Sequence, residues 1–449
     1  MFGFSYPIQW IASTVYRDSA FLHGMSSIFR GACMSSAAGT AIAIEWKHMC
    51  GSLLERGPRS SSFACDRGVL SRMYISTSAD LLEFCTRART FDAVAVDTEF
   101  LRERTYHPRL CLVQVATPDE CAVIDPLAIA DLAPLRDLLA DAAVTKVFHA
   151  CSQDMEVLHH ALGVLPAPIF DTQVAAAFLG ERIQTSYNSL VHAFCGITLP
   201  KSESLTDWSR RPLTPEQLEY AVDDVRYLIV AFGAIRERLE EQGRLSWVLD
   251  ELRPLTELSH YEVDPRAAFK RVKRVNSLTR RQLAVARELA SWRERKAEQA
   301  DIPRKWVMPD EVLLALARRP PQTPDELKRM RGTEQLSVQD VAAIIAGVER
   351  GGSCPAEKLP FLPRPHKAPA PELESVIDLM YALIRLVAER SGVATSVIAS
   401  RDELIDYVSH PERSRLREGW RFELVGTLID DLLQGNIGLT VKDRALEIL

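Results

Sequence analysis

Four acidic side chains are spaced along this chain in a pattern that suits metal-assisted chemistry. Asp97 and Glu99 end an apolar run, and residues two apart in a strand project from the same face. Two carboxylates held that close repel each other unless a cation lies between them. Because all the donor atoms are oxygens, the pair favours a hard divalent ion such as Mg²⁺ or Mn²⁺. A strand that merely ends in a solvated acidic turn is the alternative.

The third acid, Asp154, lies where a short apolar strand after residue 145 turns into a predicted helix. Ser152 is the expected N-cap of this helix. Asp154 shares a helix face with Val157 and Leu158, and an unpaired charge is costly to bury there. Attraction to the helix N-terminus explains an acid at this position equally well.

The fourth acid, Asp224, lies on a helix for which Thr214 and Pro215 are the expected N-cap and first helical residue. Asp224 borders the apolar stripe of this helix, whereas Asp223 points nearly opposite it. Tyr220 precedes Asp224 by four residues, so the phenol and the carboxylate meet on one side. A tyrosine in that place could hold or deprotonate an attacking water with the help of a metal.

Taken together, these residues resemble the DEDDy family of 3′–5′ exonucleases, and within it the ribonuclease D group. Further blocks of the resemblance follow in the same order at residues 97 to 114, 149 to 158 and 201 to 213. The resemblance covers most of residues 73 to 260. It implies a ribonuclease H-like α/β exonuclease domain, with a mixed sheet flanked by helices, that holds two divalent metal ions, Mg²⁺ or Mn²⁺.

The resemblance also implies a role for each site residue. Asp97, Glu99 and Asp224 would bind the ion on the side of the nucleophile, with Asp97 bridging to the second ion. Asp154 would anchor that second ion through water, and Tyr220 would orient the attacking water. These five residues are the predicted catalytic set, and the four acids are the predicted metal ligands.

Several other polar residues near these motifs have weaker interpretations. Lys201, Arg210 and Arg211 are candidate contacts to the RNA backbone, although ordinary solvated bases are at least as good an explanation. His149 follows an apolar strand and is expected to be a structural histidine. Asp171 is expected to be a helix N-cap.

Composition limits the classes of protein to consider. A chain of 449 residues with 47% hydrophobic content can bury several cores, and we expect two to four domains. The formal net charge is -6, yet residues 266 to 281 hold seven bases and no acid. Nine cysteines without a Cys-x-x-Cys pair indicate reduced thiols and a cytoplasmic protein. The sequence has no run of about 18 apolar residues, so no membrane span is expected.

Beyond residue 275 the sequence pattern becomes helical, with predicted helices at 278 to 298, 309 to 317, 324 to 330 and 338 to 349. This region resembles an HRDC domain, a module linked with nucleic-acid binding, and a helical segment from 373 to the end resembles a second copy. The expected division is an N-terminal extension at 1–72, the exonuclease domain at 73–260, a basic linker at 261–275, the first HRDC domain at 276–353, a proline-rich linker at 354–371 and the second HRDC-like domain at 372–449.

The N-terminal 72 residues differ in composition from the rest of the chain. They hold twelve serines, seven Lys or Arg and four acids without sustained periodicity, which is typical of an organellar transit peptide. The simpler hypothesis is a start codon assigned too far upstream, because Met73 opens a domain of the expected kind. We therefore expect this extension to be unstructured or not translated.

The function that the resemblance implies is that of a 3′–5′ exoribonuclease. It would release 5′-mononucleotides from RNA 3′ ends, with tRNA precursors as the substrate and no implied protein partner. Two alternatives are a DNA-directed exonuclease of the same family and a nucleic-acid-binding protein with an idle nuclease site. The complete set of four acids with Tyr220 disfavours the idle site.

Overall fold

The computed structural model describes residues 71–200, 206–362 and 371–449. The predicted N-terminal extension and Lys201 therefore lie outside the described residues, apart from positions 71 and 72. These two positions belong to the first strand, β1, where Arg72 forms an ion pair with Glu219. The described part of the fold thus starts two residues before Met73, and the expected boundary stays a prediction.

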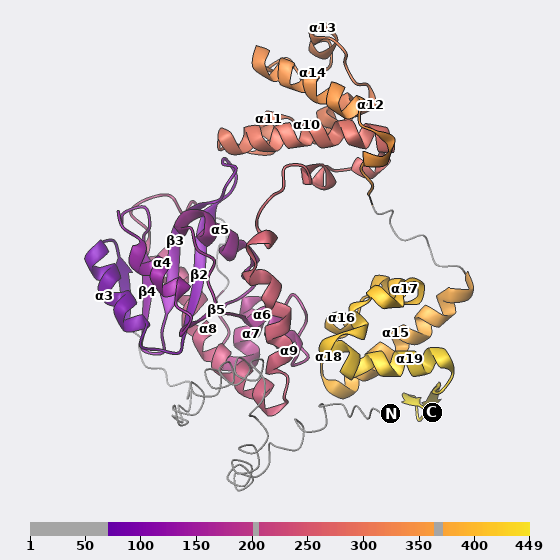
Figure 1. The fold of residues 1–449 in the computed structure, drawn as a ribbon. Helices are drawn as coiled ribbons and strands as arrows, with labels where there is room; N and C mark the ends of the chain where they lie inside the picture. The colour runs from indigo at the N-terminus through magenta and orange to yellow at the C-terminus, as the bar shows by residue number, and fades with distance from the viewer. Residues whose placement is uncertain (1–70, 201–205, 363–370) are drawn as a thin grey trace, which may run out of the picture. The chain divides into compact units, whose positions relative to one another are not determined.

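A mixed six-stranded sheet forms the centre of the first part of the chain (Figure 1). Its spatial order is β1-β4-β3-β2-β5-β6, and β3 pairs antiparallel with both of its neighbours while the other pairings are parallel. The strands are β1 Ser71–Ile75, β2 Ala93–Leu101, β3 Arg109–Ala116, β4 Glu120–Ile124, β5 Thr145–Phe148 and β6 Ile169–Asp171.

Helices cover both faces of this sheet, which explains the nearly continuous apolar character of the strands. One face packs against α3, α4 and α5 through residues such as Val94, Val96 and Val113, and the other packs against α6, α7 and α8 through residues such as Ala95 and Val147. The helices are α3 Ser78–Ala88, α4 Ala133–Ala140, α5 Ser152–Leu162, α6 Thr172–Ala177, α7 Tyr187–Cys195, α8 Pro215–Glu241 and α9 Leu245–Leu252.

The long helix α8 starts as the sequence predicts. Thr214 is the N-cap, Pro215 is the first helical residue, and Gln217 completes a capping box with Thr214. The predicted apolar stripe is buried at Ala221, Val225 and the positions that follow it. Through this stripe, α8 packs against β2, β3, β4 and β5.

A helical part follows, with bounds close to the predicted ones. Its helices are α10 Arg280–Gln299, α11 Arg304–Val307, α12 Asp310–Arg318, α13 Pro324–Lys328 and α14 Val338–Gly352. The segment expected to be a basic linker is packed rather than free, because Phe269, Val272 and Val275 are buried in the core of this part. The bases of this segment therefore belong to a folded surface.

The final part contains α15 Pro371–Ser391, α16 Thr395–Ile398, α17 Arg401–Ser409, α18 Gly419–Arg421 and α19 Thr427–Gln434. The prediction that it is helical to the end is wrong, because β7 Leu439–Lys442 and β8 Ala445–Ile448 form an antiparallel hairpin. The apolar side chains of this final part belong to the same hydrophobic cluster as those of α6, α8 and α9. In this cluster Trp247 and Trp420 stack with 5.4 Å between their ring centroids. Within the described residues, no helix has the length and apolar character that crossing a membrane requires.

Candidate active site

Three of the four predicted acids converge beside the second half of β2. Asp97, Glu99 and Asp224 each offer a carboxylate oxygen, and these oxygens lie within 4.8 Å of one another. Asp97 and Glu99 follow Ala95 at intervals of two, so they project from the sheet face that α8 covers. The packing of α8 across the sheet brings Asp224 to the same place.

The fourth acid, Asp154, approaches this cluster from the opposite sheet face. It is 8% exposed in the first turn of α5, and its carboxylate accepts a hydrogen bond from the hydroxyl of Thr98. Thr98 lies between Asp97 and Glu99 in β2 and projects from the α5 face. Asp154 therefore lies outside the group of three converging acids, although its charge acts on Asp97.

The turn before α5 is fixed by Asp171. Its carboxylate accepts hydrogen bonds from the backbone N–H groups of Ala150 at 3.1 Å and Cys151 at 2.8 Å, and it caps α6 as predicted. Ala150 has a φ of 63°, which is uncommon for a residue with a side chain. The predicted N-cap of α5 is wrong, because Cys151 holds that position and Ser152 is the first helical residue. The acceptor that organises this helix start comes from β6.

Burial is the main cause of the raised pKa values of all four carboxyl groups. It raises the pKa of Glu99 to about 8, with further contributions from Asp224 and Asp154. It raises the pKa values of Asp154 and Asp224 to about 7. The pKa of Asp97 is raised well above its usual range by burial and then by the other three acids. The cluster therefore retains protons near neutral pH, and a bound cation would replace them.

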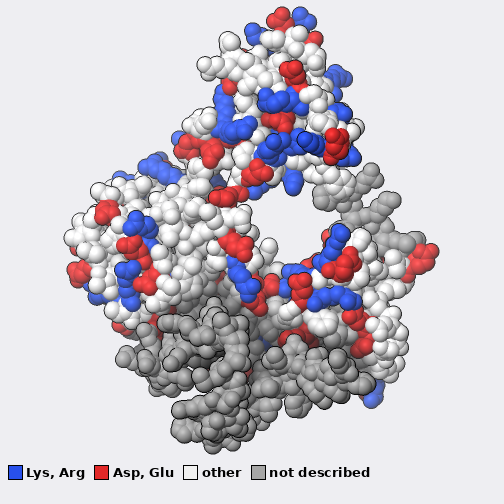
Figure 2. Space-filling view, viewed as in Figure 1, with Lys and Arg blue, Asp and Glu red and all other residues white. Residues whose placement is uncertain are grey.

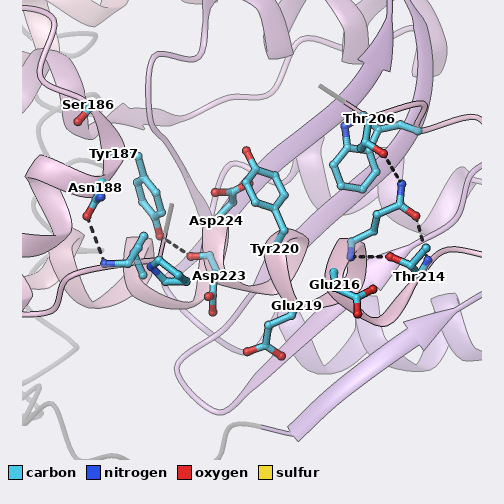
Figure 3. Close-up of a pocket in the computed structure, with 14 residues that line it drawn as sticks. Ser186, Tyr187, Asn188, Thr206, Thr214, Glu216, Glu219, Tyr220, Asp223 and Asp224 are labelled. Atoms are coloured by element: carbon cyan, nitrogen blue, oxygen red, sulfur yellow. Dashed lines mark hydrogen bonds between the residues drawn. The ribbon is translucent and has the colours of Figure 1, made fainter. Parts of the chain in front are cut away.

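Tyr220 and Asp224 lie side by side on α8, whereas Asp223 projects elsewhere (Figure 3). Interaction with the Tyr220 hydroxyl lowers the pKa of Asp224 against the effect of burial. Asp223 forms an ion pair with Arg226, and its backbone carbonyl accepts a hydrogen bond from Tyr187 at 2.8 Å. The choice of Asp224 over Asp223 agrees with this geometry.

A cavity of about 850 Å³ opens beside Tyr220 and Asp224 (Figure 3). Aromatic and polar side chains line it, including Trp208, whose ring centroid lies 5.9 Å from that of Tyr220. Trp208 was not singled out in the sequence, and neither were Thr98 and Tyr187. Trp208 and Thr98 lie inside the motif blocks, but their contacts depend on packing between distant segments.

The structure gives the predicted RNA-backbone contacts different environments. Arg210 is exposed and lies 3.4 Å from Asp207. Arg211 instead donates two hydrogen bonds, of 2.6 and 2.7 Å, to the buried carboxylate of Asp125. It also donates to the backbone carbonyls of Cys111 and Trp208. Its guanidinium therefore anchors the loop that carries Trp208. Direct contact of Arg211 with RNA is not supported by this geometry.

His149 is a satisfied structural histidine, as predicted. Its Nδ1 lies 3.0 Å from the hydroxyl of Thr172, and its Nε2 lies 3.1 Å from the backbone carbonyl of Thr185. Both ring nitrogens are thus engaged within the fold, so this histidine is not available as a base.

Basic side chains gather on the part of the molecule that contains α10 to α14, interspersed with acids (Figure 2). In the basic segment, Arg280 and Arg281 donate to backbone carbonyls near the end of this part. Lys270 and Arg271 are exposed. All seven bases of the segment are exposed, although the hydrogen bonds of Arg280 and Arg281 hold these two side chains against the fold.

Comparison with known proteins identifies the family to which this chain belongs. A family model described as a 3′-5′ exonuclease matches residues 73–240, and an HRDC domain model matches residues 282–348. Ribonuclease D of Nitrobacter hamburgensis is 41% identical over 381 residues, covering 83% of this chain and 98% of that protein. Ribonuclease D of Bartonella henselae is 37% identical over 376 residues, covering 82% of this chain and 92% of that protein.

A solved structure gives the same result for the fold. The crystal structure of Escherichia coli RNase D, described as an exoribonuclease involved in structured RNA processing, is similar with a TM-score of 0.69 and 35% identity. The match covers 82% of this chain and 99% of that chain. The relatives are thus matched over nearly their whole length, through both the sheet with its acidic cluster and the helical parts. The chain belongs to the ribonuclease D family and is a 3′–5′ exoribonuclease.

Proposed function

We propose that this chain hydrolyses RNA from the 3′ end with two divalent ions, Mg²⁺ or Mn²⁺, and releases 5′-mononucleotides. The observation that carries the proposal is the convergence of Asp97, Glu99 and Asp224 within 4.8 Å. Carboxyl groups held together with raised pKa values are a suitable site for hard cations, because all of the donors are oxygens. When bound, two such ions would activate a water and stabilise the departing 3′ oxygen.

Each acid has a proposed part in holding these ions. Asp97, Glu99 and Asp224 would hold the ion on the side of the attacking water, and Asp97 would also face the second ion. Asp154 would hold the second ion from the α5 side, through water, with Thr98 fixing its carboxylate. The bond that forms joins the water oxygen to the phosphorus, and the bond that breaks joins the phosphorus to the 3′ oxygen.

Tyr220 would orient the attacking water rather than deprotonate it. Burial and the neighbouring carboxylates raise the pKa of this phenol well above its usual value. A phenol that stays protonated can align a water through its hydroxyl, but it is a poor base. Its position next to Asp224 and the cavity supports this role.

We propose tRNA precursors as the substrate, with the terminal nucleotides of the RNA in the cavity beside Tyr220. The support is the family membership and the lining of this cavity, where the partly exposed ring of Tyr220, packed beside the buried Trp208, offers an aromatic surface for a base. Arg210, exposed on the same loop, would contact the RNA backbone, as would Lys201, which lies outside the described residues. Lys270 and Arg271 would add contacts to structured RNA from the helical part.

The test is a time course in Mg²⁺ or Mn²⁺ on a 3′-extended tRNA and on a matched single-stranded DNA. Stepwise shortening of the tRNA to its mature end, with slower loss of DNA, is the expected result. Equal or faster shortening of the DNA would contradict the proposed substrate, and loss of both strands with EDTA present would contradict the proposed cofactors.

We also propose a cytoplasmic location. Cys85, Cys111, Cys121, Cys151 and Cys354 are free thiols, which is typical of a reducing compartment. Cell fractionation with an antibody to the chain would test this, and recovery of the protein with membranes would contradict it.

A further inference from the structure

Gln114 is a buried amide beside the acidic cluster that the mechanism above does not use. Its side chain in β3 is 0% exposed. Within the part of the chain that the structure describes, neither its Oε1 nor its Nε2 has a hydrogen-bond partner. A buried polar group without partners destabilises a fold. An apolar side chain would fill this position in a core that served stability alone.

The strand register places this amide next to the cluster. Gln114 lies directly opposite Asp97 in the antiparallel pair of β2 and β3, so the two side chains project from the same sheet face. On its other side Gln114 pairs with Val123, whose side chain lies in the core that α8 covers. The amide therefore lies beneath α8, on the face where Asp97, Glu99 and Asp224 converge.

We propose that Gln114 is a positioning residue for the metal site, in which its Nε2 donates a hydrogen bond to the ionised carboxylate of Asp97. This inference rests on the proposed function, because the carboxylate is ionised when it binds a cation. An ionised carboxylate has about four acceptor sites, and bound ions would use only some of them. A donor behind Asp97 would fix which oxygens face the ions. Loss of such a partner typically weakens metal binding by about 10- to 100-fold.

A purely structural role makes the opposite prediction. If Gln114 served only the core, for example through a trapped water, its replacement would lower the melting temperature whether or not metal is present. If it serves the metal site, its replacement by an apolar side chain of similar shape removes an unsatisfied amide. The metal-free protein would then be as stable as before or more stable, while its affinity for metal would fall.

The experiment compares full-length wild type with Gln114→Met, which has a side chain of similar length. Melting temperatures are measured in EDTA, and the Kd for Mn²⁺ is measured by calorimetry without substrate. We expect an unchanged or higher melting temperature and a Kd about tenfold higher. The control is Val115→Ala, one residue along β3 and facing the α3 to α5 side. This change should lower the melting temperature and leave the Kd for Mn²⁺ unchanged.

Each outcome separates this inference from the function on which it rests. A wild type that binds no Mn²⁺ would contradict the proposed metal site itself. A wild type that binds Mn²⁺ together with a Met variant of equal affinity would overturn the role of Gln114 alone. Gln114→Leu is the second variant, and loss of folding in EDTA by both variants would assign the amide to the core and overturn the proposal.

Discussion

Neutralising Asp224 should stabilise the metal-free protein and abolish its activity. Burial raises the pKa of this carboxyl from 3.8 to about 7, so folding disfavours the ionised form. The sign follows from linkage: the destabilisation is absent below pH 3.8, grows as the pH rises towards 7, and then stays constant. A shift of this size corresponds to about 4 kcal/mol above pH 7. The asparagine of the Asp224→Asn variant carries no charge, so the variant lacks this destabilisation.

The assay is chemical denaturation of wild type and Asp224→Asn in EDTA at pH 5 and at pH 8. The free energy of unfolding of the variant should exceed that of wild type by about 4 kcal/mol at pH 8 and by less than about 2 kcal/mol at pH 5. Excess Mg²⁺ should reverse the order at pH 8, because only wild type retains all of the proposed ligands. The rate of hydrolysis should fall on the order of a thousandfold.

Glu240→Gln provides the matched control, because it neutralises an exposed acid on the same helix. Glu240 pairs with Arg236 at 2.8 Å, and exposed pairs of this kind contribute about 0 to 1 kcal/mol. This variant should keep its activity and its pH profile of stability. If Asp224→Asn is less stable than wild type in EDTA at pH 8, the reasoning on buried charge is refuted. If it hydrolyses RNA at a rate near that of wild type, the ligand assignment is refuted.

Three further changes test other parts of the site. Tyr220→Phe should slow hydrolysis by about 100-fold while the Kd for Mn²⁺ is unchanged; an unchanged rate would remove the tyrosine from the mechanism. Asp171→Asn should raise the Mg²⁺ concentration needed for half-maximal activity, because the side chain loses one of the two oxygens that accept hydrogen bonds from the start of α5. Adding Ala150→Gly should restore part of the loss, because glycine adopts the left-handed backbone conformation of this turn more easily. No rescue by glycine would show that the turn is not what Asp171 controls. Lys270→Ala combined with Arg271→Ala should weaken binding to structured RNA and reduce its salt dependence, with little change on short single strands; equal salt slopes would exclude these two bases as phosphate contacts.

Most of the α/β part follows from sequence because its signals are local. The apolar runs of β2, β3 and β4 are bounded by polar residues, and the Thr214 capping box marks the start of α8. The position of each acid relative to the apolar stripe of this helix is enough to choose Asp224 over Asp223 as the predicted metal ligand. The relation between Asp154 and Thr98 depends instead on two elements meeting across the sheet, so no spacing along the chain predicts it.

The features that sequence reasoning missed have physical reasons of the same kind. The turn of the C-terminal hairpin has positive φ at Asp443 and Arg444, and it lacks the glycine that usually follows Asp or Asn in such a turn. From sequence alone Arg211 resembles a solvated base, because its partner Asp125 is distant in the chain and meets it only in the folded protein. The division into six segments stays a prediction, and the burial of Phe269 favours assigning the basic segment to the first helical part.

The second helical part adds a constraint on any truncation. Arg421 pairs with Glu251 of α9 and accompanies the stacking of Trp420 on Trp247. Removing residues 371 to 449 would uncover this apolar surface and leave Glu251 without its cation. A shortened enzyme would therefore test stability as well as RNA binding, and point changes on the exposed bases separate the two.

The most direct test of the central claim is the identity of the first product from an RNA labelled at its 3′-terminal nucleotide. With Mg²⁺, wild type should release that label as a nucleoside 5′-monophosphate. Asp97→Ala, or wild type in EDTA, should release none. Release of the label by wild type in EDTA, or as part of a longer fragment, would contradict metal-dependent exonucleolytic hydrolysis at the cluster of Asp97, Glu99 and Asp224.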